Sequence, residues 1–314
     1  MSDAQQPAAG VSDAGDTVRT VVENVQRVIV GNDETIEHAL VAMLGGGHVL
    51  LEDVPGVGKT MLARALARSF ECEFKRVQFT PDLLPADITG TNVFNQKTRE
   101  FDFREGPIFG NVVLGDEINR APPKTQAALL EAMEEETVTV DGDTRQVPDP
   151  FFVVATQNSV ERDRTYELPA AELDRFMMKL TLGYPDALEE QEVLGRMVGD
   201  HPIEDLEPVA TVADLRAARE TAANVTVEEP LREYVTRLAR YSRDNAQLGA
   251  SPRASIALLK AAQGRAILDG REYVVPDDVQ QEAVPALAHR IRVGGAEGNA
   301  RDVVRAALEA VDVE

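Results

Sequence analysis

The chain has 314 residues, a single cysteine and a formal net charge of −22, and 43% of its residues are apolar. This length predicts about two domains, and the negative net charge disfavours sequence-independent binding of nucleic acid. No apolar run approaches the ~20 residues of a membrane span, and residues 1–10 lack the basic start of a secretory signal. Because Cys72 is alone, neither a disulfide framework nor a cysteine metal site is expected. We therefore expect a cytoplasmic protein without a transmembrane segment.

The acidic excess is unusual, since 54 Asp and Glu stand against 32 Lys and Arg. One interpretation is a halophilic protein, because at 1 M salt a screening length of ~3 Å removes the self-repulsion of a highly charged chain. The alternative is an acidic protein that binds a basic partner.

The N-terminal part of the chain predicts a tail and two helices. Residues 1–16 have no periodicity and are typical of a flexible tail. Apolar residues recur at helical spacing over residues 17–30, and Gly31 ends that helix. A second helix follows and ends at the glycines at positions 45–47.

The stretch from Glu52 to Thr60 predicts a phosphate-binding loop, because it follows an apolar strand and precedes a helix over residues 61–70. Backbone N–H groups of the loop and the positive end of the helix form an anion cradle. Lys59 would reach the β- and γ-phosphates of a nucleoside triphosphate, and Thr60 would offer its hydroxyl to Mg²⁺. The expected nucleotide contacts in this loop are Pro55, Gly56, Val57, Gly58, Lys59, Thr60 and Met61.

One position departs from the general pattern G-x-x-x-x-G-K-[ST], because Asp53 replaces the first glycine. Asp53 stands at the end of the strand, away from the closest approach of the phosphates, so the cradle can survive. Its negative charge must point away from the anion or be paired.

The stretch from residue 74 to residue 182 alternates strands and helices. Several strands are apolar throughout, which indicates an α/β fold with a parallel sheet covered on both faces. Two hairpins interrupt the pattern, and Asp141-Gly142 marks a type I′ turn in the second. The predicted strands are 74–79, 92–95, 100–103, 111–117, 137–140, 144–147, 151–155 and 176–182, with a helix over 123–135.

Past residue 184 the strand pattern disappears. The predicted helices cover residues 186–199, 211–223, 228–248, 252–269, 276–291 and 299–312. The chain therefore predicts a tail (1–16), a nucleotide-binding core with two hairpin insertions (17–184) and a separate α-helical domain (185–314).

Ligands of open parallel sheets bind at the carboxyl ends of the strands, where Thr60, Glu117 and Asn158 all fall. Asp116 would hold Mg²⁺ through water, and Glu117 would orient and deprotonate the attacking water. Asn158 follows a strand expected between the phosphate-loop strand and the Asp-Glu strand. It could hold the same water or only cap a turn.

Two arginines complete the predicted site. Arg175, at the start of the last strand, is expected to lie too far from its own nucleotide and to act on a neighbour's γ-phosphate, which implies a ring of subunits. The alternative is a surface salt bridge. Arg253 follows Ser251-Pro252 at a helix N-terminus, where it could touch the γ-phosphate, or simply belong to a helix start.

Taken together, these motifs resemble the MoxR family of AAA+ ATPases over roughly residues 17–293, and the run from Glu117 to Gln126 is highly specific. Further matching stretches are 53–60, 115–126, 130–135, 155–158, 173–176 and 251–254. The resemblance implies a P-loop core with a C-terminal all-α lid, and ATP and Mg²⁺ as cofactors.

The resemblance also implies roles for individual positions. The hairpins would be the helix-2 and pre-sensor-1 insertions of this clade, and residues 28–31, with Val30 and Gly31, would lie near the adenine. The matched positions are Lys59 and Thr60 in Walker A, Asp116 and Glu117 in Walker B, Asn158 as sensor 1, Arg175 as the arginine finger and Arg253 as sensor 2.

Members of the family assemble as hexameric rings and are thought to act as chaperones that mature or remodel protein complexes. They often work with von Willebrand factor A domain proteins, so the resemblance implies a protein client and such a partner. One departure follows Asn158, where residues 159–164 are charged instead of the family's proline and glycine-containing stretch. Arg162 or Arg164 could therefore share the finger role.

Competing functions remain open at this point. A nucleic-acid motor of the same clade would carry the same hairpins. The turn Asp141-Gly142-Asp143 is acidic, however, whereas a hairpin that tracks DNA needs Lys or Arg at its tip, and Arg145 is a single basic residue. A non-enzymatic nucleotide-gated scaffold is disfavoured by the complete set of catalytic positions. A relative of the magnesium chelatase motor subunit is a close enzymatic variant that motifs alone do not exclude.

Overall fold

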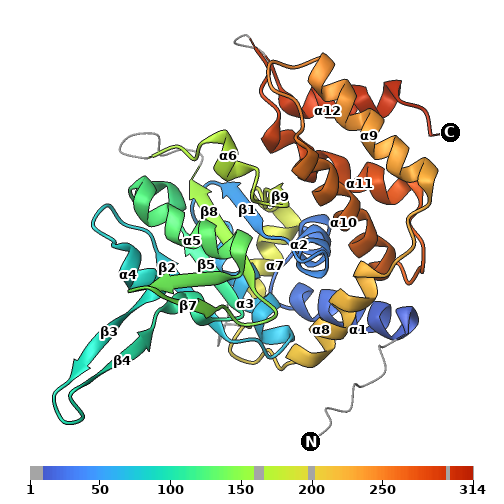
Figure 1. The fold of residues 1–314 in the computed structure, drawn as a ribbon. Helices are drawn as coiled ribbons and strands as arrows, with labels where there is room; N and C mark the ends of the chain where they lie inside the picture. Colours follow the sequence, from blue (N-terminus) through green and yellow to red (C-terminus); the bar gives the residue numbers. More distant parts are fainter. Residues whose placement is uncertain (1–9, 159–165, 197–201, 295–297, 314) are drawn as a thin grey trace, which may run out of the picture.

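The computed structural model describes residues 10–158, 166–196, 202–294 and 298–313. At its centre lies a five-stranded parallel sheet with the strand order β2-β5-β8-β1-β9 (Figure 1). The strands are β1 (Val49–Asp53), β2 (Phe74–Gln78), β5 (Val112–Asp116), β8 (Phe152–Asn158) and β9 (Met178–Leu180). β8 therefore lies between β1 and β5, as the sequence predicts.

Helices cover both faces of the sheet, because successive side chains of a buried strand point to opposite faces. Val112 and Leu114 of β5 belong to the hydrophobic cluster that contains the N-terminal helices, whereas Val113 belongs to the cluster on the other face. The helices of the first face are α1 (Val11–Gln26), α2 (Asp33–Leu44) and α3 (Lys59–Ser69), and those of the second are α4 (Pro85–Thr89) and α5 (Pro123–Glu135). The predicted α/β architecture is confirmed.

Two hairpins stand outside the sheet. β3 (Gly90–Asn95) pairs with β4 (Glu100–Glu105), and β6 (Thr137–Val140) pairs with β7 (Asp143–Gln146). Between β6 and β7, Asp141 and Gly142 have φ angles of 52° and 93°, the left-handed pair that a type I′ turn needs. The β3–β4 hairpin reaches away from the body of the molecule (Figure 1).

Helices dominate the chain after residue 185, and each predicted helix is found within a few residues of its expected bounds. They are α7 (Ala187–Arg196), α8 (Val212–Ala223), α9 (Glu229–Asp244), α10 (Pro252–Leu268), α11 (Pro276–Leu287) and α12 (Ala300–Ala310). Four short helices connect other elements. They are the 3-10 helices η1 (Pro107–Phe109), η2 (Ile118–Arg120) and η3 (Ala288–Arg290) and the α-helix α6 (Ala170–Leu173). In the described ranges, no helix combines the length and apolarity that crossing a bilayer would need.

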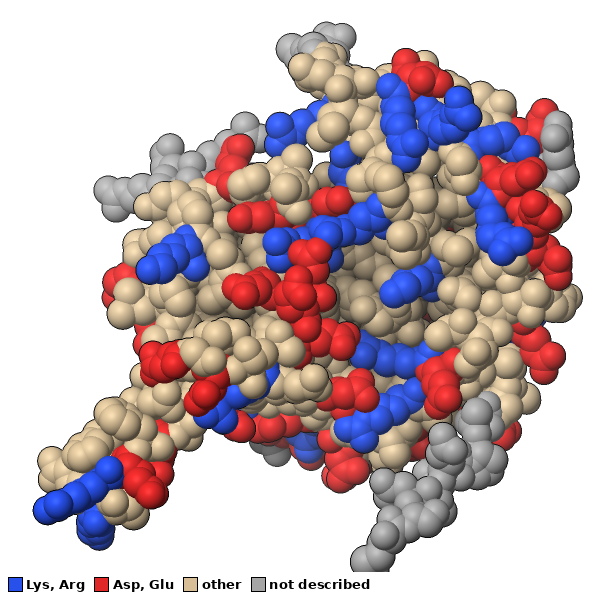
Figure 2. Space-filling view, in the orientation of Figure 1, with Lys and Arg blue, Asp and Glu red and all other residues tan. Residues whose placement is uncertain are grey.

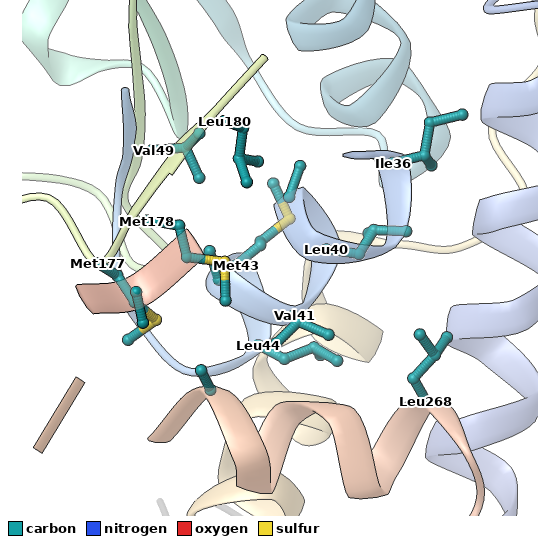
Figure 3. Packing of buried hydrophobic residues seen from close by; sticks show 14 of the residues in the cluster. Ile36, Leu40, Val41, Met43, Leu44, Val49, Met177, Met178, Leu180 and Leu268 are labelled. Carbon is teal, nitrogen blue, oxygen red and sulfur yellow. The ribbon is translucent and has the colours of Figure 1, made fainter. Parts of the chain in front are cut away.

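These C-terminal helices share a core with the N-terminal ones. A single hydrophobic cluster includes α1 and α2 together with α8, α10 and α11. Figure 3 shows Val41 and Leu44 of α2 directed towards the helix that carries Leu268, which is α10. At Gly264 of α10, a Cβ would stand 2.8 Å from the carbonyl oxygen of Val41. The predicted helical region is present, but its core is not separate.

The N-terminal boundary differs from the prediction. α1 begins at Val11 rather than at residue 17, so residues 11–16 are helical and do not belong to a tail. This first turn packs closely, because Ala14 is buried and a Cβ at Gly15 would stand 2.8 Å from the carbonyl oxygen of Ile267. Tertiary contacts therefore extend the helix beyond its apolar periodicity. Residues 1–9 lie outside the described part of the chain.

Candidate nucleotide-binding site

The loop between β1 and α3 has the geometry of a phosphate-binding loop. Gly56 and Gly58 have φ angles of 85° and 98°, which residues with a side chain rarely adopt. α3 begins at Lys59 with Gly58 as its N-cap, so the free N–H groups of the first helical turn border the loop. No atom lies within 4 Å of a Cβ built at either glycine, which leaves room for an anion. These features together form an amide-rich anion cradle.

A cavity of about 370 Å³ opens at this loop. Its walls come from three segments that are distant in the sequence, namely the loop, the end of β5 and the end of β8. The lining residues are Pro55, Gly56, Gly58, Lys59, Thr60, Met61, Asp116, Glu117, Thr156 and Asn158. The structure thus brings the predicted phosphate loop, the predicted acidic pair and Asn158 to one cavity.

Three of the predicted nucleotide contacts do not line this cavity. Val57 is partly buried and packs against the larger hydrophobic cluster. Val30 is buried, and Gly31 lies against α7, where a Cβ would collide with the carboxylate of Glu189. The expected position of Val30 and Gly31 near the adenine therefore stays a prediction.

Asp53 is paired, as its place beside an anion site requires. Its Oδ1 accepts a hydrogen bond from the N–H of Val54 at 2.8 Å, and its Oδ2 accepts from the N–H groups of Leu182 at 2.7 Å and Gly183 at 2.6 Å. The residue is only 8% exposed. The carboxylate therefore joins the start of the phosphate loop to the segment that follows β9.

Lys59 is folded onto the loop. Its ammonium donates to the carbonyl oxygen of Asp53 at 2.8 Å and to that of Val54 at 2.9 Å. Burial lowers the pKa of Lys59, while the carboxylates of Asp53, Asp116 and Glu117 act in the opposite direction. A phosphate in the cavity would favour the charged ammonium and offset the cost of burying it.

Asp116, at the end of β5, is held by two donors. The hydroxyl of Thr156 donates to Oδ1 at 2.6 Å, and the guanidinium of Arg76 on β2 donates to Oδ2 at 2.6 Å. Thr60 and Asp116 provide the hard oxygen atoms that Mg²⁺ prefers, and Mg²⁺ commonly takes only one or two protein ligands beside phosphate and water. In the part of the chain that is described, no cluster of three or more His, Cys, Asp or Glu could hold a metal.

Glu117 follows β5 in a left-handed conformation with φ 57° and ψ 50°. Its N–H donates to the hydroxyl of Thr156 at 2.8 Å, which ties the end of β5 to β8. Its Oε2 accepts from the side chains of Gln78 and Arg120, both at 2.8 Å. Two donors thus hold this carboxylate oxygen in place.

Sequence reasoning missed the side chains that hold the acidic pair. Gln78 becomes a neighbour of the acidic pair only through the parallel register of β2 and β5, in which Gln78 lies opposite Asp116. For Thr156 a signal existed, because residues two apart on a strand point to the same face and Asn158 was already a candidate.

Asn158 ends β8 opposite Asp53 of β1 and is buried. It lines the cavity together with Thr60 and Glu117. Residues 159–165 follow it and lie outside the described residues, and they include Arg162 and Arg164. A shared finger role for these two arginines stays a prediction.

Arg175 and Arg253 lie together, and neither lines the cavity. Arg175 Nη1 stands 3.0 Å from Oε2 of Glu134 on α5, and the guanidinium of Arg253 pairs with Oε1 of the same carboxylate. Arg175 also donates to the carbonyl oxygen of Leu130 at 2.7 Å. Arg253, at the start of α10, thus pairs with a residue of α5, and its contact with a γ-phosphate stays a prediction.

The start of α10 is attached to the segment before β9. Ser251 caps the helix by accepting a hydrogen bond from the N–H of Ala254 at 3.1 Å, as the sequence predicts, and its hydroxyl donates to Asp174 at 2.9 Å. Arg290 donates to the carbonyl oxygen of Asp174 at 3.0 Å. These contacts keep Arg253 beside Arg175.

Arg145 of β7, the basic residue considered for nucleic-acid tracking, is engaged elsewhere. Its guanidinium lies 3.9 Å from the centroid of the Phe103 ring, and it stands 3.8 Å from the carboxylate of Asp143. Arg145 is therefore already in contact with side chains of its own chain.

Comparisons with known proteins bear on nearly the whole chain. Residues 48–178 match the ATPase family associated with various cellular activities (AAA), and residues 238–309 match an AAA lid domain. The chain is 53% identical to the uncharacterized protein YeaC of Bacillus subtilis over 93% of both chains. It is 43% identical to chaperone MoxR1 of Mycobacterium tuberculosis over 90% of this chain and 78% of the relative. A solved structure of a candidate ATPase from Cytophaga hutchinsonii is 36% identical, with a TM-score of 0.88 and 96% of both chains covered.

Proposed function

This chain belongs to the MoxR family of AAA+ ATPases, and we propose that it hydrolyses ATP to ADP and phosphate in the cavity at the phosphate loop. The observation that carries the proposal is the meeting of Lys59 and Thr60, the pair Asp116 and Glu117, and Asn158 around one cavity. These are the groups that phosphoryl transfer to water needs, because catalysis of that reaction rests on positioning and charge neutralisation.

Each group has a proposed role. Mg²⁺, held by Thr60 and Asp116, would neutralise charge on the phosphate oxygens. The loop amides and Lys59 bind the β- and γ-phosphates. Glu117 orients the attacking water and takes its proton, and Asn158 holds the same water from the next strand.

Arg175 and Arg253 complete the cavity of a neighbouring subunit in this proposal. Neither residue lines the cavity of its own chain, and both pair with the single carboxylate of Glu134, which leaves one positive charge uncompensated by this pairing. A neighbour's γ-phosphate would compete with Glu134 for these two cations. The proposal therefore includes a homo-oligomeric ring, for which family membership indicates a hexamer.

The proposed clients are proteins. The relative named chaperone MoxR1 supports a chaperone role, and we infer that ATP turnover drives the maturation or remodelling of protein complexes in the cytoplasm. A von Willebrand factor A domain partner is part of the proposal, and its only support is the resemblance to the family.

Variants of three positions test hydrolysis and the role of the neighbour. Lys59→Ala should lose nucleotide binding, because the phosphates lose their main side-chain cation. Glu117→Gln should bind ATP and turn over roughly 10²-fold to 10⁴-fold more slowly, the usual contribution of a general base. Arg175→Ala should bind ATP normally and lose about 10³-fold in rate, the usual contribution of an arginine finger. Calorimetry measures binding, and phosphate release measures turnover.

Mixing two inactive variants separates action across an interface from action within one chain. A Lys59→Ala subunit still carries Arg175, which can serve the intact phosphate loop of an Arg175→Ala neighbour. Activity should therefore return on mixing, and mixtures that stay inactive would contradict the ring. A Glu117→Gln pull-down that recovers DNA without a protein would favour a nucleic-acid motor.

A further inference from the structure

The β3–β4 hairpin presents an exposed aromatic pair. Phe94 is 50% exposed and Phe101 is 69% exposed, and the two residues are direct partners in the antiparallel register. Their ring centroids are 5.3 Å apart. Directly opposite residues share one face of a hairpin, so the rings form one apolar patch on an arm that extends from the body of the molecule (Figure 1). Large exposed apolar groups side by side mark interaction sites.

The base of the same face is already filled. Phe103 packs on the ring of Phe109 with a centroid distance of 5.7 Å, and Arg145 of β7 covers Phe103. Asn92 donates to the carboxylate of Asp141 at 2.8 Å, which ties the two hairpins together. The arm is therefore anchored through its base, and Phe94 and Phe101, which lie further out, belong to neither hydrophobic cluster among the described residues.

Basic residues follow the aromatic pair at the end of the arm. Lys97 and Arg99 are exposed in the turn between the two strands. Figure 2 shows Lys and Arg side chains at the far end of this arm, in a molecule whose net charge is −22. An apolar patch beside basic residues complements an apolar segment that is flanked by acidic residues.

We propose that Phe94, Phe101 and the basic turn bind an extended apolar segment, flanked by Asp or Glu, of a client protein. This inference rests on the proposed function, to which it adds the contact surface and the chemistry of the client. Bases of single-stranded nucleic acid also stack on aromatic rings, but such sites combine stacking with a basic groove that tracks the backbone. Here the basic residues of the arm stand together in the turn, and Glu100 and Asp102 interrupt a basic track along β4. A local basic site fits the acidic flank of a short peptide segment better than it fits a continuous phosphate backbone.

Peptide binding to the full-length chain tests the proposal. The probe is a fluorescent peptide with a Leu- and Phe-rich centre and Asp flanks, measured by anisotropy without nucleotide. The double variant Phe94→Ala/Phe101→Ala should weaken binding about tenfold or more, because two aromatic contacts are lost. Val93→Ala is the matched control, since Val93 is 36% exposed on the same strand but points to the other face. The control should bind like the wild type.

The basic turn has its own test. Lys97→Glu/Arg99→Glu should lose the preference for Asp-flanked over Lys-flanked peptides of the same apolar centre, and reversed preference would be the strongest form of this result. Thermal unfolding of all variants verifies that the fold is intact, since the altered side chains are exposed.

Three results would overturn the proposal. The first is equal peptide affinity of the wild type and the Phe94→Ala/Phe101→Ala variant. The second is tighter binding of a single-stranded oligonucleotide than of the peptide. The third is a Phe94→Ala/Phe101→Ala variant that differs from the wild type only in its sedimentation, which would assign the patch to a contact with a second copy of the chain. Phosphate release, measured in parallel, keeps the two proposals apart. If the variant loses peptide binding but keeps its ATP turnover, the result supports the role of the arm. If the wild type binds the peptide but releases no phosphate, the proposed ATP hydrolysis is wrong while the peptide site stands.

Discussion

Asp53 occupies a place where phosphate loops commonly have glycine, and its carboxylate accepts three backbone N–H groups. Hydrogen bonds from N–H groups stabilise a buried carboxylate, so this side chain is accommodated beside the phosphate loop. Two of the donors belong to Leu182 and Gly183, which precede the C-terminal helices. A single side chain thus explains the sequence departure and links the loop to the segment that leads to the lid.

His48 is held in its neutral form by two backbone groups. Its Nε2 lies 3.1 Å from the carbonyl oxygen of Met133, and its Nδ1 accepts from the N–H of Val153 at 3.1 Å. The carbonyl requires a proton on Nε2, and the N–H requires a lone pair on Nδ1, so a second proton would break the latter bond. Burial, above all, lowers the pKa of His48 from 6.5 to about 4.

This environment predicts acid sensitivity. Between pH 6.5 and about pH 4, His48 is protonated in the unfolded chain but neutral in the folded chain. The free energy of unfolding therefore falls as the pH falls through this window. The loss from this residue reaches at most about 3 kcal/mol. His48→Gln keeps a donor and an acceptor but does not titrate, so its stability should fall less between pH 7.5 and pH 5. Urea unfolding at both pH values measures the difference, and parallel losses in the two proteins would contradict the argument.

Among the elements, α10 depends on a close approach to α2. Ala257, Ala261 and Ala262 of α10 are buried, and Gly264 faces the backbone of α2 at Val41. Small residues let two helices approach closely, which increases their dispersion contacts. The absence of a side chain at Gly264 is therefore part of the contact between the N-terminal and C-terminal helices.

Gly264→Ala should destabilise the protein despite its better helix propensity. The new Cβ would stand 2.8 Å from a backbone oxygen, so α2 and α10 must move apart. Overpacking of this kind costs about 1–3 kcal/mol, more than the ~1 kcal/mol gained when alanine replaces glycine in a helix. Gly195→Ala in α7 is the control, because nothing lies within 4 Å of its Cβ, and this variant should be neutral or more stable. Equal urea midpoints for the two variants would show that the approach is loose.

At the scale of the whole molecule, charge is the dominant property. Acidic side chains are spread over the face seen in Figure 2, and the net charge is −22. Like charges at this density repel each other and destabilise the compact state at low ionic strength. Halophilic adaptation of the chain stays a prediction, and it can be measured directly.

Stability should rise with salt. The screening length falls from about 10 Å at 0.1 M to about 3 Å at 1 M, so self-repulsion should largely disappear in multimolar KCl. We expect the melting temperature to increase by more than about 3 °C, the shift that ~1 kcal/mol produces in a chain of this size. Thermal unfolding at 0.1 M and 2 M KCl gives the answer. An unchanged melting temperature would instead favour the alternative, in which the acidic protein binds a basic partner.

The sheet, its helices and the phosphate loop could be predicted from the amino-acid sequence, because each depends on a pattern within a short stretch of chain. Gly56 and Gly58 need left-handed backbone angles, Lys59 and Thr60 must open a helix, and the acidic pair must end a buried strand. The order of these elements along the chain was enough to indicate where their side chains meet.

The other side chains that hold the site could not be predicted in this way, because long-range contacts bring them there. Gln78 reaches Glu117 through the register of two strands, Arg253 joins Arg175 at Glu134, and α1 starts early because its first turn packs on α10. Each of these contacts joins residues far apart in the sequence. Periodicity tells which face of an element is buried, but it carries no information on the partner that covers that face.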